Sequence, residues 1–180
     1  MLAARREGRI VFVEDESTFS LKPYTTRAWY PRGDAVRVSM THAPHERFYV
    51  FGVMNGRKEH YRFYDGRKTK AMNAIMTLDF LGYLHARYPR VLLFWDKASH
   101  HGKSKKVREY AAAHDIRLID FPTAVPEENP AEQAWNTLAA ATANSYYANY
   151  EALLAELKRC ARSKNLSELP GAEAPGVVAV

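Results

Sequence analysis

A short, unbroken apolar run in the middle of the chain sets the strongest constraint on its fold. Residues Val91 to Trp95 are all apolar, and Asp96 follows them directly. A run of this kind, without polar alternation, is typical of a β-strand that is covered by helices on both faces. A carboxylate at the carboxyl end of such a strand lies where open α/β sheets place their reactive groups. The alternative is that Asp96 only ends the strand and solvates a turn.

The order of the other hydrophobic patterns predicts an α/β fold with a mixed sheet flanked by helices. Strand patterns and amphipathic helical patterns alternate along much of the chain, as they do when helices cover a sheet. Asn55–Gly56 joins two strand patterns and predicts a hairpin with a type I′ turn, which requires positive φ at both central residues. The predicted strands are 10–13, 47–54, 59–64, 91–95 and 116–119, with short extended pieces at 19–24 and 25–30, and the predicted helices are 69–88, 103–114, 130–142 and 150–161.

Length and composition fit one folded domain. The chain has 180 residues, of which 47% are hydrophobic, and this is enough to form a substantial core. No apolar run approaches the length of a membrane span. The only cysteine is Cys160, which excludes a disulfide framework and a cysteine-based zinc site and is compatible with a cytoplasmic protein. We expect a linker remnant at 1–9, one domain at 10–162 and a flexible tail at 163–180.

The charge of the chain favours a polyanionic partner. The formal net charge is +6 and the pI is about 9.4, values that are frequent in proteins that bind nucleic acid. The predicted helix at 103–114 carries Lys103, Lys105 and Lys106 in its first turn, where the helix dipole disfavours positive charge. A bound anion would offset this cost. The alternative is a solvated basic helix face.

Three carboxylates stand at the ends of predicted elements. Asp15 follows the first strand, and Asp96 follows the apolar strand after the long helix. Glu132 lies in the first turn of the helix that Asn129 and a proline open. Each has a structural alternative: Asp15 can bond nearby backbone groups at a strand end, and Glu132 stands at the position of a capping-box glutamate.

Longer sequence blocks surround these three acids. The blocks are Val11–Ser17 with Arg27–Gly33, Leu93–His101 with Lys103–Arg108, and Ile116–Pro122 with Pro126–Trp135. Together they resemble the catalytic domain of the DDE transposases of the mariner superfamily, in its prokaryotic insertion-sequence branch. The resemblance covers residues 10–160, and several spaced blocks are far more specific than a single motif.

The resemblance implies a fold, a reaction and a set of site residues. It implies an RNase H-like α/β fold and metal-dependent cleavage and strand transfer of DNA at transposon ends. The family's three catalytic, metal-binding acids match Asp15, Asp96 and Glu132, which would hold two Mg²⁺ or Mn²⁺ ions, because hard cations prefer carboxylate oxygens. The basic residues that would contact DNA phosphates are Lys97, Lys103, Lys105, Lys106 and Arg108.

The sequence also departs from the family pattern. Lys97 stands where relatives usually carry Asn, and only nine residues precede Ile10, where relatives carry helix-turn-helix segments. The expected partners are therefore DNA, a second copy of the chain in a homodimer, and an upstream helix-turn-helix segment or subunit, with no membrane. Two alternatives are a structure-specific nuclease on the same fold and a truncated nucleic-acid-binding remnant without enzymatic activity.

Overall fold

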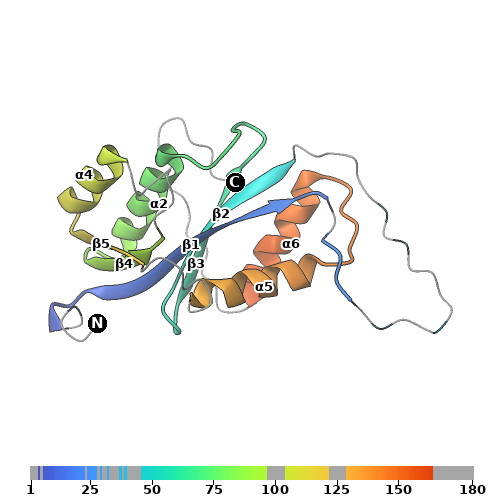
Figure 1. Cartoon of the computed structure of the whole chain (residues 1–180), viewed down its shortest axis with the longest axis horizontal. Coiled ribbons are helices and arrows are strands. Elements are labelled where there is room, and N and C mark those ends of the chain that lie inside the picture. Colours follow the sequence, from blue (N-terminus) through green and yellow to red (C-terminus); the bar gives the residue numbers. More distant parts are fainter. Residues whose placement is uncertain are drawn as a thin grey trace.

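Five strands and the helices beside them form the described part of the chain (Figure 1). The computed structural model describes residues 4, 6–22, 24–27, 29, 32, 37, 39, 46–96, 104–121 and 129–163. The predicted flexible tail, apart from its first residue, lies outside this set. The strands are β1 (Ile10–Ser20), β2 (Arg47–Met54), β3 (Glu59–Asp65), β4 (Val91–Trp95) and β5 (Ile116–Asp120), and the helices are α2 (Ala74–Arg87), α4 (Lys105–Ala113), α5 (Pro130–Thr142) and α6 (Tyr150–Ser163).

The sheet is mixed, as the sequence predicts. Its strand order is β3-β2-β1-β4-β5. β1, β2 and β3 form an antiparallel meander, whereas β4 and β5 run parallel to β1 on its other side. A parallel neighbour requires a crossover connection, and α2 lies in the connection between β3 and β4. β1 is therefore the central strand, with an antiparallel neighbour on one edge and a parallel neighbour on the other.

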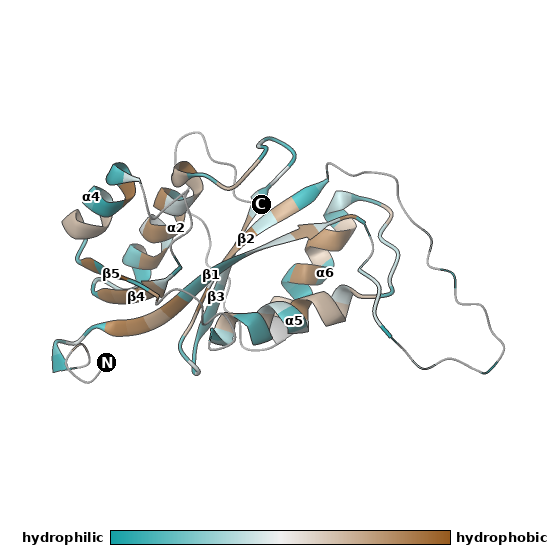
Figure 2. Ribbon diagram, viewed as in Figure 1, coloured by the Kyte–Doolittle hydropathy of each residue, from teal (hydrophilic) through white to brown (hydrophobic). Residues whose placement is uncertain are grey.

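Two hydrophobic cores cover the two faces of the sheet. Along β2, Tyr49, Phe51 and Val53 belong to the core under α2 and α4, whereas Phe48 and Val50 belong to the core under α5 and α6. This alternation follows from the two-residue period of a strand, in which successive side chains point to opposite faces. Figure 2 shows the apolar first half of β1 and the apolar strand β4 beneath the helices. Helices α2 and α4 therefore cover one face of the sheet, whereas α5 and α6 cover the other face at the antiparallel strands β1, β2 and β3.

Side-chain caps fix the starts of the helices. The Asn73 side chain accepts hydrogen bonds from the backbone N–H groups of Ile75 and Met76, so α2 begins at Ala74 instead of at the predicted residue 69. Ser104 caps α4 in the same way. Asn129 caps α5, whose first residue is a proline, and this confirms the start that the sequence predicts.

β1 is longer than predicted. The sequence pattern ends this strand at Val13, but the structure continues it to Ser20. The reason is pairing with β2, which runs from Val13↔Met54 to Ser20↔Arg47 and satisfies the backbone of the polar half of the strand. The carboxylates that follow Val13 therefore lie within β1, at the point where its parallel neighbour ends, and not at a strand terminus.

The predicted hairpin is present, but its predicted turn is wrong. β2 and β3 pair up to Met54↔Glu59, which leaves Asn55–Lys58 as the loop. Gly56 has φ of +78°, whereas Asn55 is not among the residues with positive φ, so the turn is not of type I′. The Asn55 side chain accepts hydrogen bonds from the backbone N–H groups of Arg57 and Lys58 at 3.1 and 2.9 Å, which stabilises a longer loop.

Among the helices that the structure describes, none is long and apolar enough to cross a membrane.

Candidate active site

A group of acids lies where β4 ends beside β1. The two strands pair in parallel up to Val13↔Phe94, and two further residues in this register bring Asp15 beside Asp96. The side chains of Asp15, Glu16 and Asp96 each place a carboxylate oxygen within 4.8 Å of the others. Asp96 is exposed, and the other two are partly buried. Two of the three acids that the sequence singles out therefore lie together, with Glu16 as an additional member.

The polar half of β1 places acids on both faces of the sheet. Asp15 lies toward α5, where the indole N–H of Trp135 donates a hydrogen bond to its Oδ2 at 2.9 Å. Glu14 stands two residues after Phe12 and therefore shares its face of the sheet, which is opposite to the face of Asp15. Only 2% of the Glu14 surface is exposed. Neither carboxylate oxygen of Glu14 has a hydrogen-bond partner. Such burial of an unpaired acid is costly, so its position beside the other acids needs a functional reason.

Burial and mutual repulsion make these acids harder to ionise. Burial raises the pKa of Asp15 to about 6, and the charges of Glu16 and Asp96 act in the same direction, while the Trp135 hydrogen bond opposes them. The pKa of Glu14 is raised well above its usual range, mainly by burial and further by the charges of the neighbouring acids. A cation at this point would relieve both effects.

The donor set fits a hard divalent cation. Carboxylate oxygens of Asp15 and Glu16 on β1 and of Asp96 at the end of β4 converge. Mg²⁺ and Mn²⁺ prefer oxygen ligands, and Mg²⁺ is usually held by a few carboxylates with water and substrate completing its coordination. These residues could therefore hold a divalent ion at the end of β4.

Glu132 lies in the first turn of α5 and is exposed. The cap of this helix is the Asn129 side chain, which accepts from the Ala131 N–H at 3.0 Å. Within the part of the chain that the structure describes, the Glu132 carboxylate makes no hydrogen bond and no ion pair, so the capping-box alternative is not formed. Glu132 is also outside the group of converging acids. Its assignment as the third catalytic acid stays a prediction.

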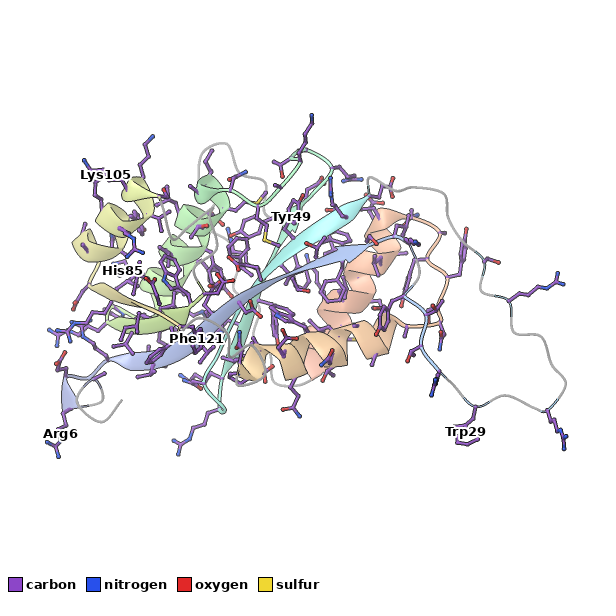
Figure 3. The ribbon with its side chains drawn as sticks, in the orientation of Figure 1. Arg6, Trp29, Tyr49, His85, Lys105 and Phe121 are labelled. Atoms are coloured by element: carbon purple, nitrogen blue, oxygen red, sulfur yellow. The ribbon has the colours of Figure 1, made fainter. Side chains whose placement is uncertain are left out.

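The predicted DNA-contacting residues fall into two sets. Lys97 and Lys103 lie outside the described residues. The other three lie on α4, whose outer end carries Lys105 (Figure 3). Lys105 forms an exposed ion pair with Glu109 at 3.6 Å, and Arg108 lies 3.5 Å from Asp120. Lys106, the remaining one, is exposed, and the role of all these residues in DNA binding stays a prediction.

Sequence reasoning missed three features of the site. Glu14 and Glu16 stand on either side of Asp15, so the acidic run itself could have indicated them. The contact between Asp15 and Trp135 joins residues that are 120 positions apart. Trp135 stands in one of the sequence blocks described above, but nothing in that block indicates its partner.

Comparison with known families decides the classification. A family model described as DDE superfamily endonuclease matches residues 9–154. The chain belongs to this family. No curated protein sequence matches it.

Several solved structures share the fold. The mariner Mos1 paired end complex with Mg matches with a TM-score of 0.65 and 16% identity, over 91% of this chain and 52% of that one. The Mos1 mariner paired end complex with Mn matches with a TM-score of 0.61 and 17% identity, over 88% and 51%. An intasome of simian T-cell lymphotropic virus in complex with a PP2A regulatory subunit matches with a TM-score of 0.54 and 12% identity, over 82% and 46%.

These likenesses confirm the RNase H-like α/β fold of this DDE-family chain. At such low sequence identity they establish the fold only. The chain spans about half the length of the transposase chains that it matches.

Proposed function

We propose that this chain is the catalytic domain of a DNA transposase, which cleaves phosphodiester bonds at transposon ends and transfers the strands to a target. The observation that carries the proposal is the convergence of Asp15, Glu16 and Asp96 at the end of β4, in a chain of the DDE endonuclease family. Acids at the carboxyl end of a parallel strand are well placed for substrate, because open α/β sheets bind their ligands outside the carboxyl ends of the strands.

The proposed cofactor is Mg²⁺ or Mn²⁺, bound as two ions. The Mos1 complexes named above contain Mg and Mn according to their descriptions. In this chain Asp15 and Asp96 would hold the ions, with Glu132 as the third protein ligand. When bound, a pair of such ions supplies activation of an attacking hydroxyl and stabilisation of the departing 3′ oxygen.

The chain's own side chains orient these ligands and attract the substrate. Trp135 holds one oxygen of Asp15, and Glu16 adds a further carboxylate to the group. Lys106 and its neighbours on α4 would bind DNA phosphates, which gives affinity without reading the base sequence. We propose that sequence recognition is supplied by an upstream helix-turn-helix segment or subunit, and that two copies act together as a homodimer on transposon ends and target DNA.

Nicking of supercoiled plasmid in Mn²⁺ tests the cleavage part of the proposal. Wild-type protein should nick the plasmid, whereas Asp15→Asn, Asp96→Asn and Glu132→Gln should not. Glu109→Gln is a matched control, because it removes an exposed acid from α4 outside the group. Loss of nicking in this control, or wild-type nicking by Asp96→Asn, would contradict the proposed site.

Strand transfer distinguishes a transposase from a nuclease on the same fold. A labelled duplex with a free 3′ hydroxyl is incubated with plasmid, protein and Mn²⁺. Covalent joining of the label to the plasmid is the expected result. Nicks without joined product would favour the structure-specific nuclease, and neither product would favour a nucleic-acid-binding remnant.

A further inference from the structure

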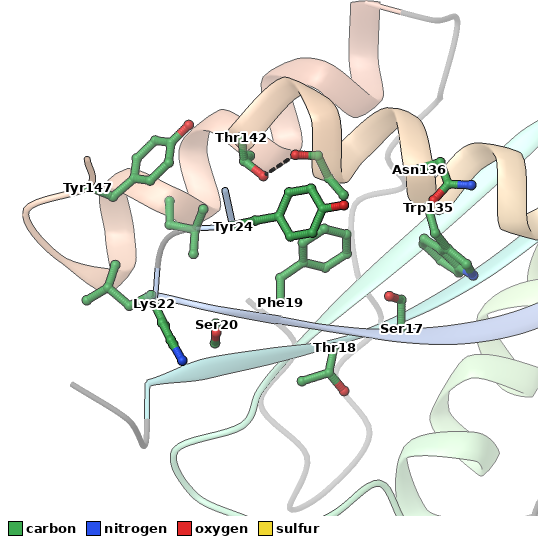
Figure 4. Close-up of a pocket in the computed structure, with 13 residues that line it drawn as sticks. Ser17, Thr18, Phe19, Ser20, Lys22, Tyr24, Trp135, Asn136, Thr142 and Tyr147 are labelled. Carbon is green, nitrogen blue, oxygen red and sulfur yellow. Dashed lines mark hydrogen bonds between the residues drawn. The ribbon is translucent and has the colours of Figure 1, made fainter. Parts of the chain in front are cut away.

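Trp135 makes the hydrogen bond that joins α5 to the acid group. Its indole N–H donates to Asp15 Oδ2 at 2.9 Å, and only 7% of the Trp135 surface is exposed. Figure 4 shows this side chain reaching from α5 toward β1 near Ser17. We propose that Trp135 is a positioning residue for metal binding by Asp15, and that Gly52 is required because only a glycine leaves room for the indole. This inference rests on the proposed function.

Gly52 lies directly opposite Asp15 in the β1–β2 pairing. A Cβ atom added at Gly52 would lie 2.7 Å from Cη2 of Trp135, closer than real Cβ contacts, and 3.1 Å from Cζ2, which is tighter than most of them. The φ of Gly52 is not in the left-handed region, so backbone conformation does not explain the glycine. The indole therefore occupies the volume that any other side chain at this position would fill.

The neighbouring strand holds the other side of the indole. Tyr61 pairs with Gly52 across β2 and β3, and its ring packs edge-to-face on Trp135 with centroids 5.5 Å apart. The Tyr61 hydroxyl in turn donates to Glu59 at 3.0 Å. Asp15, Gly52 and Tyr61 thus form one row across three strands, and the indole lies over this row. Its position is fixed by packing, so its N–H is held in place for Asp15.

A neutral donor suits a carboxylate that binds a cation. The indole N–H can donate but carries no charge, so it orients Asp15 without neutralising it. A guanidinium in the same place would compete with a metal ion for the carboxylate. The hydrogen bond uses one acceptor position of Oδ2, and the carboxylate has further acceptor positions with which it can bind a cation. Because Glu132 lies one helical turn before Trp135, the same contact sets the first turn of α5 relative to Asp15.

The test compares Trp135→Phe with Leu138→Ala. The Phe variant keeps an aromatic ring over Gly52 but lacks the N–H. Leu138 is the control position, because it is buried on α5 in the same core as Trp135. Mn²⁺ affinity is measured by isothermal titration calorimetry, and folding by circular dichroism and thermal melting. We expect Trp135→Phe to raise the Mn²⁺ dissociation constant about tenfold or more, the usual effect of losing a hydrogen bond to a metal ligand. Leu138→Ala should lower the melting temperature but leave the dissociation constant unchanged.

Gly52→Ala gives a second, independent variant. It keeps the indole but displaces it, so Mn²⁺ affinity should fall although Trp135 is intact. The indole N–H resonance of Trp135 is identified by NMR as the one missing from Trp135→Phe. In the wild-type protein this resonance should shift when Mg²⁺ is added. Wild-type affinity in a folded Trp135→Phe protein, or equal loss of affinity in Leu138→Ala, would overturn the positioning role. Absence of Mn²⁺ binding by the wild type would instead contradict the proposed function itself.

Discussion

Two buried carboxylates on the same face of the sheet have opposite surroundings. Asp79 of α2 receives two hydrogen bonds from Arg62, at 2.5 and 3.1 Å, and one from the Tyr64 hydroxyl at 2.7 Å. Glu14 of β1 is just as deeply buried, but neither of its oxygens has a partner. The fold therefore provides hydrogen-bond partners for the buried carboxylate of Asp79 but none for that of Glu14.

The difference separates a structural acid from acids kept for a ligand. A fully bonded ion pair fixes β3 against α2, and removal of one partner would leave a buried charge without compensation. The acids on β1 instead repel each other, and burial raises their pKa values. Such a cluster costs free energy in the absence of a cation. This contrast supports the proposal that Asp15 and its neighbours bind a cation, whereas the Asp79 network stabilises the fold.

The largest expected effect is on catalysis. Asp96→Asn should reduce Mn²⁺-dependent DNA cleavage by at least about 10³-fold, because several kcal/mol of transition-state stabilisation would be lost. DNA binding should stay the same or become tighter, because a negative charge is removed from the surface that faces phosphate. Plasmid nicking and fluorescence anisotropy measure the two effects. Loss of DNA binding together with cleavage in Asp96→Asn would show that Asp96 also supports the structure, as Asp79 does.

The next effect is on stability. Asp79→Ala should destabilise the protein by about 3–5 kcal/mol, because Arg62 would be left buried without its partner. Asp96→Ala, at an exposed position, should change the free energy of unfolding by less than about 1 kcal/mol in metal-free buffer. Urea denaturation of both variants provides the measurement. Similar destabilisation by both substitutions would show that the two regions do not differ as described.

The pH dependence of stability sharpens the comparison. The pKa of Glu14 is higher in the folded than in the unfolded protein, so the folded state binds more protons above the ordinary pKa of 4.5. Stability should therefore fall as pH rises from 4.5 toward the raised pKa, by up to about 1.4 kcal/mol per pH unit from this group. Glu14→Gln should remove this part of the slope, so the free energy of unfolding of the variant should fall less steeply than that of wild type as pH rises above 4.5 in the presence of a chelator. An unchanged slope in urea denaturation would show that Glu14 ionises normally.

The smallest effect is on DNA binding by α4. Lys106→Ala should weaken binding to any duplex and lower the slope of log K against log salt by about 1. Lys105→Ala should have a weaker effect, because Lys105 already pairs with Glu109. Anisotropy titrations at several salt concentrations, on two unrelated duplexes, measure both. A strong preference for one duplex would reveal a sequence-reading element in this chain.

Local patterns in the sequence predict the framework of the fold and two acids of the site. The apolar run before Asp96 predicts a buried strand, and Asn129 with Pro130 predicts the start of α5, because both depend on nearest neighbours. The full length of β1 could not be predicted, since its polar half is held by pairing with β2. The bond from Trp135 to Asp15 and the burial of Glu14 depend on packing between distant segments, which no local pattern encodes.

Diffraction from a crystal soaked in Mn²⁺, recorded at the manganese absorption edge, tests the central claim most directly. We predict anomalous peaks within coordination distance of Asp15 and Asp96, with the Glu132 carboxylate turned to the same site and Asp79 still bound to Arg62. Manganese found only elsewhere on the surface, or no peak between Asp15 and Asp96, would contradict the claim that the converging acids at the end of β4 are arranged to bind a divalent ion.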